Sequence, residues 1–160
     1  MISRSWAVGL IAGLLLVAVP RVRADVYRVG DQFGGFKGVD QHGKEFVFEP
    51  GSWRFIIFET PGESGEAAPP KDPEWFDKNR AVMMVNISEF SSFKKRIARG
   101  RLESKPFRLI VIDDKDLAGR FPRQQGKFTV LQLDDKGVIT AISHPAPGKE
   151  LQALIAPETK

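Results

Sequence analysis

The sequence predicts an α/β domain in three layers, with helices covering both faces of a largely parallel sheet. Residues 55–58, within a predicted central strand at 53–58, and residues 81–87 are apolar runs without the alternation of a half-exposed strand, which indicates strands covered on both faces. Helix signals separate the successive runs, as parallel strands joined by helical crossovers require. Near the end, residues 128–133 and 138–143 flank the turn sequence of residues 134–137, which predicts an antiparallel hairpin.

Residues 1–24 are set apart from this domain by their composition. An apolar run of 14 residues (6–19) is followed by Val22 and Ala24, the small-residue pattern that signal peptidase accepts. The run falls short of the roughly 20 residues that a membrane span needs, which disfavours the alternative of an uncleaved anchor. We therefore expect a cleaved signal peptide, a mature domain of residues 25–160 with no stable membrane span, and a periplasmic or secreted protein.

The first β-prone pieces of the mature chain predict a hairpin at the N-terminal side of the sheet. Residues 36–39 and 45–48 flank residues 40–43, D-Q-H-G, which have the composition of a tight turn. Residues 49–52 then break the pattern and lead into the central strand at residues 53–58.

A short helix is predicted after the central strand and the Pro/Gly loop that follows it. Asp72 can cap the helix, Pro73 suits its first position, and Glu74 favours the positive end of its dipole. We expect this helix to end near Arg80, directly before the strand at residues 81–87.

The next helix is predicted to be amphipathic. Ser88 is its candidate cap, and Phe90, Phe93 and Ile97 recur at helical spacing among basic residues, which predicts a helix to about Gly100.

Three further elements complete the order. Residues 108–113 predict a third strand, and residues 117–121 a short turn of helix. After the hairpin, a last helix would face the sheet with Leu151, Leu154 and Ile155.

The chain contains no cysteine. Thiol–disulfide exchange, thiol peroxidase chemistry and thiolate metal sites are therefore excluded, because each requires a sulfur that this protein lacks. Removing residues 1–24 deletes three arginines and no acid, so the formal net charge falls from +4 to +1. A charge this small does not favour nucleic acid as a partner.

The element order resembles the thioredoxin-like superfamily in its redoxin version, over residues 27–155. The segments that carry the resemblance are F-K-G-V-D-Q-H-G-K-E-F, R-F-I-I-F, R-L-I-V-I-D-D-K-D-L-A-G-R-F and F-T-V-L-Q-L-D-D-K-G-V-I. More narrowly, V-N-I-S-E-F and F-P-R-Q-Q-G-K-F-T-V-L-Q-L are similar to small exported bacterial proteins of unknown role. Some of those carry an FAD/FMN-containing dehydrogenase label, which no motif of this sequence supports.

The departures from the redoxin pattern concern its catalytic residues. The resemblance implies a Cys-x-x-Cys or a single reactive cysteine after the central strand, where this chain has residues 60–66, T-P-G-E-S-G-E. It also implies a cis-proline where Phe128 precedes Thr129, and a non-proline cis bond would cost about 3 kcal/mol, so we expect a trans bond. The resemblance therefore implies the fold without its redox site.

The candidate site residues cluster at that degenerate redox loop. We expect a binding region made of Thr60, Glu63, Ser64, Glu66, Trp75 and Phe128. The hydroxyls of Thr60 and Ser64 are poor candidates for nucleophiles, because the two histidines do not form a recognisable triad with them. No metal-ligand spacing, phosphate loop, calcium loop or dinucleotide motif is present, so we predict neither a metal site nor a cofactor.

Two charged segments are possible partner surfaces. A basic patch comprises Lys94, Lys95, Arg96, Arg99 and Arg101, and residues 59–77 carry six acids against one lysine. Such asymmetry can steer an anionic lipid surface or an acidic protein to one side of the molecule. The plainer alternative is a pair of solvated surfaces.

Three functions remain open at this point. The first is a binding or accessory module of the cell envelope that holds an unknown protein or small ligand without thiol redox activity. The second is an oxidoreductase that relies on a bound flavin, haem or metal. The third is an envelope assembly component without a small ligand. Fold alone does not choose among them.

Overall fold

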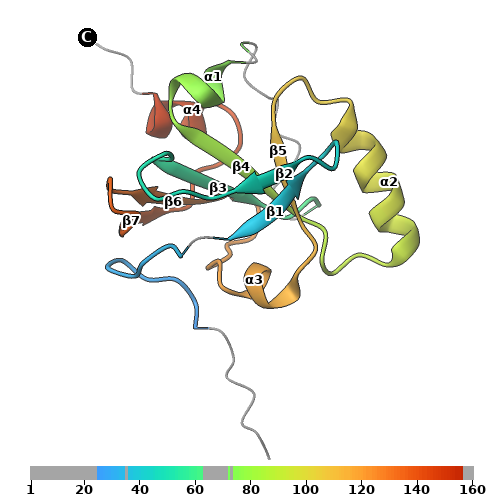
Figure 1. Ribbon diagram of the computed structural model, residues 1–160, viewed down its shortest axis with the longest axis horizontal. Helices are drawn as coiled ribbons and strands as arrows, with labels where there is room; N and C mark the ends of the chain where they lie inside the picture. Colours follow the sequence, from blue (N-terminus) through green and yellow to red (C-terminus); the bar gives the residue numbers. More distant parts are fainter. Residues whose placement is uncertain (1–24, 35, 63–71, 73, 157–160) are drawn as a thin grey trace, which may run out of the picture.

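The structure, a computed structural model, describes residues 25–34, 36–62, 72 and 74–156. The expected signal peptide of residues 1–24 lies outside these residues. Seven strands form one sheet in the order β2-β1-β5-β4-β3-β6-β7, and helices lie on both of its faces (Figure 1). The strands are β1 (Lys37–Asp40), β2 (Glu45–Val47), β3 (Phe55–Glu59), β4 (Ala81–Asn86), β5 (Leu109–Ile112), β6 (Thr129–Leu133) and β7 (Ile139–Ser143). The helices are α1 (Trp75–Lys78), α2 (Ser92–Glu103), α3 (Lys115–Gly119) and α4 (Lys149–Ile155).

The strand directions confirm the predicted sandwich. β3, β4 and β5 are parallel, whereas β6 and β7 continue the sheet as an antiparallel hairpin beside β3. The β1–β2 hairpin joins the other side by pairing antiparallel with β5. β3 therefore has one parallel and one antiparallel neighbour. None of the helices among the described residues has the length and hydropathy needed to cross a bilayer.

Alternation along β3 divides the core between the two faces of the sheet. Ile56 and Phe58 point into a first cluster, and Phe55 and Ile57 point into a second. All four side chains are buried, and burial of each contributes about 1.5–3 kcal/mol. The unbroken apolar run thus serves both faces, as its sequence predicted.

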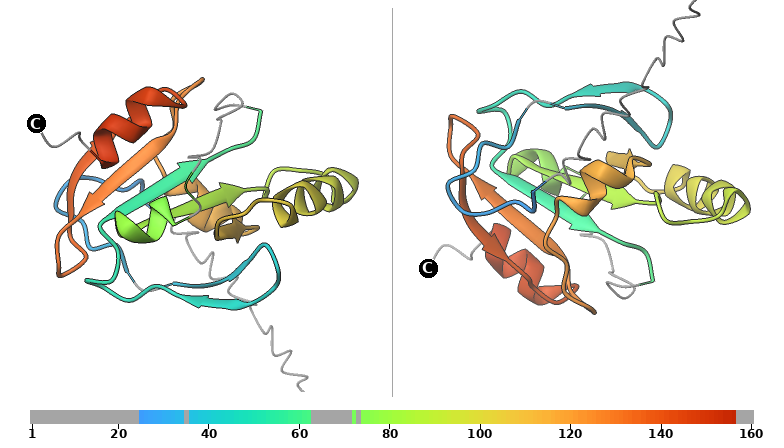
Figure 2. Two further views of the ribbon diagram at one scale, coloured as in Figure 1. Left: turned by 90° about the horizontal axis from the view of Figure 1, so that it is seen from above. Right: turned by 90° about the horizontal axis from the view of Figure 1, so that it is seen from below.

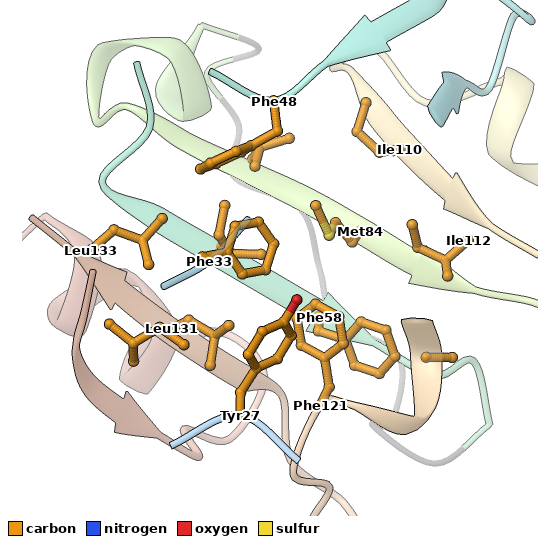
Figure 3. Packing of buried hydrophobic residues seen from close by; sticks show 14 of the residues in the cluster. Tyr27, Phe33, Phe48, Phe58, Met84, Ile110, Ile112, Phe121, Leu131 and Leu133 are labelled. Carbon is orange, nitrogen blue, oxygen red and sulfur yellow. The ribbon is translucent and has the colours of Figure 1, made fainter. Parts of the chain in front are cut away.

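The first cluster is rich in aromatic rings and is covered by α3 and the N-terminal segment (Figure 3). The rings of Phe58 and Phe121 stack with their centroids 4.0 Å apart. Tyr27 packs edge-on against Phe121, and the Arg120 guanidinium lies 4.1 Å from the centre of the Tyr27 ring. These contacts hold the segment around Tyr27 on the sheet.

The second cluster is covered by α1, α4 and the last turn of α2. α1 and α4 lie on the side of the sheet opposite α3 (Figure 1). Phe76, Leu102, Leu151 and Ile155 are the buried helix residues of this cluster. Leu154 is partly buried against it, which confirms the predicted inner face of the last helix.

α1 begins later than its sequence predicts. Its N-cap is Glu74, and no side chain caps it. The Asp72 carboxylate instead accepts a hydrogen bond of 2.9 Å from the N–H of Glu74 and so forms a local turn before the helix.

α2 differs from its prediction in its cap, its length and its orientation. Its N-cap is Ser91, whose hydroxyl oxygen accepts from the N–H of Lys94 at 3.4 Å, so the prediction of Ser88 was wrong. The helix continues past Gly100 to Glu103 because Leu102, in the last turn, packs into the second cluster. Of the predicted apolar stripe, Phe93 and Ile97 lie on the exposed side of α2, and Phe93 is 63% exposed. Phe90 precedes the helix and packs against the second cluster.

Candidate functional site

Polar residues follow the carboxyl ends of the parallel strands β3 and β4. Glu59 and Thr60 stand at the end of β3, and Asn86 and Ser88 at the end of β4. Because Glu59 pairs in register with Val85, these four residues come to the same edge of the sheet. An open α/β sheet usually binds its ligand at this edge. We call Glu59, Thr60, Asn86 and Ser88 the strand-end site.

Three of these side chains are linked by hydrogen bonds. The side-chain N–H of Asn86 donates to the Thr60 hydroxyl oxygen at 3.3 Å. The Asn86 carbonyl oxygen accepts from the backbone N–H of Ser88 at 3.0 Å and from its hydroxyl at 2.7 Å. All three residues are buried, so these bonds replace water and join the ends of β3 and β4. The arrangement is that of a structural cross-link.

The histidines lie away from the strand-end hydroxyls. His42 is in the β1–β2 turn, and its neighbour Gln41 donates to the carbonyl oxygen of Phe107 at the amino end of β5. This is the opposite edge of the sheet from the strand-end site. His144 contacts the carbonyl oxygen of Pro122 through its Nε2 atom at 3.0 Å. Neither of these contacts involves the hydroxyl of Thr60 or Ser88.

Glu59 is the titratable group of the strand-end site. It shares a face of β3 with Ile57, beside Val85 of β4 and the start of β6. Burial in this apolar setting raises the pKa of the Glu59 carboxyl to about 7, although the positive charge of Lys105 acts to lower it. Glu59 therefore exchanges a proton near neutral pH.

Glu59 did not stand out among the acidic residues of its segment by composition alone. The signal that identifies it is period-two alternation, because a residue two places after the buried Ile57 lies on the same covered face. Asn86 and Ser88 were likewise not predicted as site residues. Their pairing with Thr60 depends on the alignment of β3 with β4, which no local pattern specifies.

The structure places the predicted loop residues in different settings. Phe128 is fully buried in the second cluster and lies just before Thr129, which pairs with Phe58 of β3. The described residues contain no cis peptide bond, so the expected trans bond at Phe128 is confirmed. Because its side chain is fully buried, Phe128 belongs to the core and presents no surface to a ligand.

Of the other members of the predicted binding region, Trp75 is described by the structure. Trp75 is partly buried in the first turn of α1, with its ring centre 5.1 Å from that of Phe76. Glu63, Ser64 and Glu66 fall outside the described residues. In the part of the chain that the structure covers, no three His, Asp or Glu side chains come together as metal ligands.

The basic patch lies on α2, and part of it is neutralised. Lys95 and Arg99 both bind the Asp113 carboxylate, at 2.6 Å and 3.1 Å. Burial opposes ionisation of Asp113, but these two cations outweigh it and lower the pKa of the carboxyl. The pairing attaches α2 to the end of β5. Lys94, Arg96 and Arg101 remain exposed on the other side of the helix.

No protein-family model and no curated protein matches the chain. Among solved structures, the thioredoxin domain of a thiol-disulfide oxidoreductase from Bacteroides vulgatus is similar, with a TM-score of 0.50, 12% identity and coverage of 81% of this chain and 96% of that one. A thio-disulfide isomerase from Thermus thermophilus has a TM-score of 0.47 and 17% identity, and the match covers 84% and 99% of the two chains. A thiol peroxidase from Chromobacterium violaceum has a TM-score of 0.44 and 17% identity, and the match covers 78% and 80%.

At these identities the likeness concerns the fold alone. The Bacteroides domain aligns along nearly its whole length with the sheet and helices described above. The chain therefore has a thioredoxin-like α/β fold, and it has that fold without a single cysteine.

Proposed function

We propose that this protein is an exported thioredoxin-like binding or accessory module that performs no thiol redox chemistry. The observation that carries the proposal is the composition of the strand-end site. The chain has no cysteine, and the carboxyl ends of β3 and β4 hold Glu59 and a hydrogen-bonded set of Thr60, Asn86 and Ser88 instead.

The hydrogen bonding within the site favours binding over catalysis. The Ser88 hydroxyl donates to Asn86, so its proton is held by an amide oxygen that is too weak a base to activate a nucleophile. The proposed contact surface is the segment from Thr60 to Trp75, which includes Glu63, Ser64 and Glu66. Its occupant is a protein or small ligand of the cell envelope.

Glu59 would make such binding depend on pH. Its pKa of about 7 means that the carboxyl changes charge within the neutral range. A ligand that presents a cation would bind better above pH 7, and one that accepts a hydrogen bond from the protonated carboxyl would bind better below it.

The compartment is part of the proposal and rests on residues 1–24 of the sequence. Expression of the full chain in a bacterial host, followed by fractionation and N-terminal sequencing, tests it. We expect the protein in the periplasm or medium, beginning at Asp25. Recovery of the uncleaved chain from the cytoplasm would contradict export.

The proposed absence of redox activity is tested with purified residues 25–160 and a cysteine-containing thioredoxin as positive control. We expect no insulin reduction, no peroxide consumption and no visible absorption band of a flavin or haem. A stoichiometric flavin or haem band would replace the proposal with that of a cofactor-dependent oxidoreductase.

The binding surface is tested by photo-crosslinking in the native envelope. A photoreactive amino acid at Glu74, which is exposed beside α1, should capture one recurring partner. The same probe at Val29, which is exposed in the N-terminal segment on the other face of the sheet from α1, is the control and should not capture it. Capture of the same partner from both positions, or from neither, would contradict the proposed surface.

A further inference from the structure

The outer face of α2 presents two large apolar side chains to solvent. Phe93 is 63% exposed and Ile97 is 43% exposed. They are one turn apart and form a short ridge along the helix. α2 extends beyond the sheet, so this ridge lies on a projecting part of the molecule (Figure 2).

Helix geometry places this ridge opposite the side that packs on the domain. At about 100° per residue, Leu102 lies about 180° from Phe93, and Leu102 is the residue of α2 that is buried in the second cluster. Ile97 lies only about 40° from Phe93. The ridge is therefore directed away from the core.

Cations flank the ridge on both sides. Arg96 lies about 60° to one side of Phe93, and Arg101 and Lys94 lie about 80° and 100° to the other. All three are exposed, and the Arg96 guanidinium stands 5.7 Å from the centre of the Phe93 ring. The outer face thus consists of an apolar ridge between two basic borders. We call Phe93, Lys94, Arg96, Ile97 and Arg101 the outer face of α2.

The distribution of ion pairs separates these cations from their neighbours. Lys95 and Arg99 are bound to Asp113, and Arg108 lies 3.6 Å from the Asp40 carboxylate. Lys94, Arg96 and Arg101 form no ion pair with any residue that the structure describes. Inward-facing cations are thus paired within the fold, whereas those of the outer face are available to an external anion.

We propose that the outer face of α2 docks on an anionic lipid surface, with Phe93 and Ile97 entering the interface and the flanking cations contacting lipid phosphates. An apolar stripe bordered by Lys and Arg is the pattern of helices that lie in the plane of a membrane interface. An acidic protein would need the cations but gains little from an apolar ridge on a convex helix. The inference goes beyond the proposed function, because it uses a different part of the molecule.

The test measures partition of residues 25–160 onto vesicles by flotation. This chain keeps both core clusters and every described helix and strand, and it lacks the apolar run of residues 6–19, which would bind lipid by itself. The vesicles contain equal amounts of phosphatidylglycerol and phosphatidylcholine, or phosphatidylcholine alone. We expect binding to the anionic vesicles only, and weaker binding when salt is raised from about 0.1 M to about 1 M, which shortens the Debye length from about 10 Å to about 3 Å.

Two double variants address the two components of the face. Phe93→Ser/Ile97→Ser and Arg96→Gln/Arg101→Gln should each lower the partition coefficient about tenfold or more, since each basic residue near an anionic surface contributes about a factor of five. Matched controls are Val26→Ser/Val29→Ser, which removes exposed apolar side chains elsewhere, and Lys136→Gln/Lys149→Gln, which removes two exposed cations. The controls should change partition less than about twofold.

The inference is overturned if the parent chain does not bind, or if it binds equally well to neutral vesicles. It is also overturned if the Phe93→Ser/Ile97→Ser variant binds as well as the parent, because that result would indicate simple electrostatic adsorption. Binding to polyglutamate but not to vesicles would assign the face to an acidic protein. Unchanged thermal unfolding of the variants, whose substituted side chains are exposed, excludes misfolding as the cause of lost binding.

Discussion

The strand-end site and the outer face of α2 differ in how their polar groups are satisfied. At the strand-end site, Asn86 hydrogen-bonds to Thr60 and Ser88, and all three side chains are buried. On the outer face of α2, both the cations and the apolar side chains are exposed. The cations there form no ion pair with any described residue. The side-chain groups of Asn86 and Ser88 are thus satisfied within the fold, whereas the charged groups of the outer face of α2 are open to solvent.

The largest expected effect is loss of the strand-end hydrogen bonds. Asn86→Ala removes the buried acceptor of two Ser88 donors and the N–H that donates to Thr60, and should lower the free energy of unfolding by about 2–4 kcal/mol. Urea unfolding measures it. Asn79→Ala is the matched control, because Asn79 donates only one bond, to the Trp75 carbonyl oxygen near the surface, and should cost about 1 kcal/mol or less. Equal costs would show that the cluster is not a special cross-link.

Glu59→Gln should stabilise the protein, and only at neutral and higher pH. The folded-state pKa of Glu59 is about 7 and the ordinary value is 4.5, so between these values the folded state holds a proton that the unfolded state has lost. The contribution of Glu59 to the free energy of unfolding therefore falls as pH rises from about 4.5 to 7, and it stays low above pH 7.

The Glu59→Gln variant removes this penalty. The full shift corresponds to roughly 3 kcal/mol, and because the side chain is only partly buried we expect a gain of about 1–2 kcal/mol at pH 8 and none at pH 4. Denaturant midpoints at the two pH values measure it. The exposed Glu45→Gln substitution should show no such pH-dependent gain. A gain that is equal at both pH values would exclude the proton as its cause.

Asp113→Asn removes the carboxylate that pairs with Lys95 and Arg99, so that these two cations become unpaired like those of the outer face of α2. Loss of its bonds to Lys95 and Arg99 should lower stability by about 0.5–1 kcal/mol at pH 7, as expected for partly exposed pairs. Because the pKa of Asp113 is lowered in the folded state, its contribution is present above its unfolded pKa and is lost as pH falls through the folded one. The parent and the variant should therefore converge in acid, which thermal unfolding across pH would show.

The smallest stability effect is expected on the outer face of α2. Phe93→Ser/Ile97→Ser should change the free energy of unfolding by no more than about 0.5–1 kcal/mol, because these side chains make little use of the core. Leu102→Ala, on the inner side of the same helix, should cost about 2 kcal/mol or more. If the two variants lost similar stability, the ridge would be part of the core in solution.

The two apolar patterns of the sequence had different outcomes for a physical reason. In β3 every side chain from Phe55 to Phe58 is apolar, so either facing buries it and the prediction did not depend on orientation. In α2 the recurrence of Phe93 and Ile97 correctly indicated a helix but did not show which side packs. Leu102, which packs in the second cluster, and the ion pairs of Lys95 and Arg99 with Asp113 hold the opposite side of the helix against the domain.

The sequence by itself determined the order of strands and helices, the coverage of β3 on both faces and the exclusion of thiol chemistry, since these depend on periodicity and composition. Only the tertiary structure decided that Asn86 joins Thr60 to Ser88, that burial raises the pKa of Glu59, and that α2 directs its apolar ridge outward. Hydrogen-bond partners, desolvation and helix facing depend on neighbours that are distant along the chain, and the packing of the sheet brings those neighbours together.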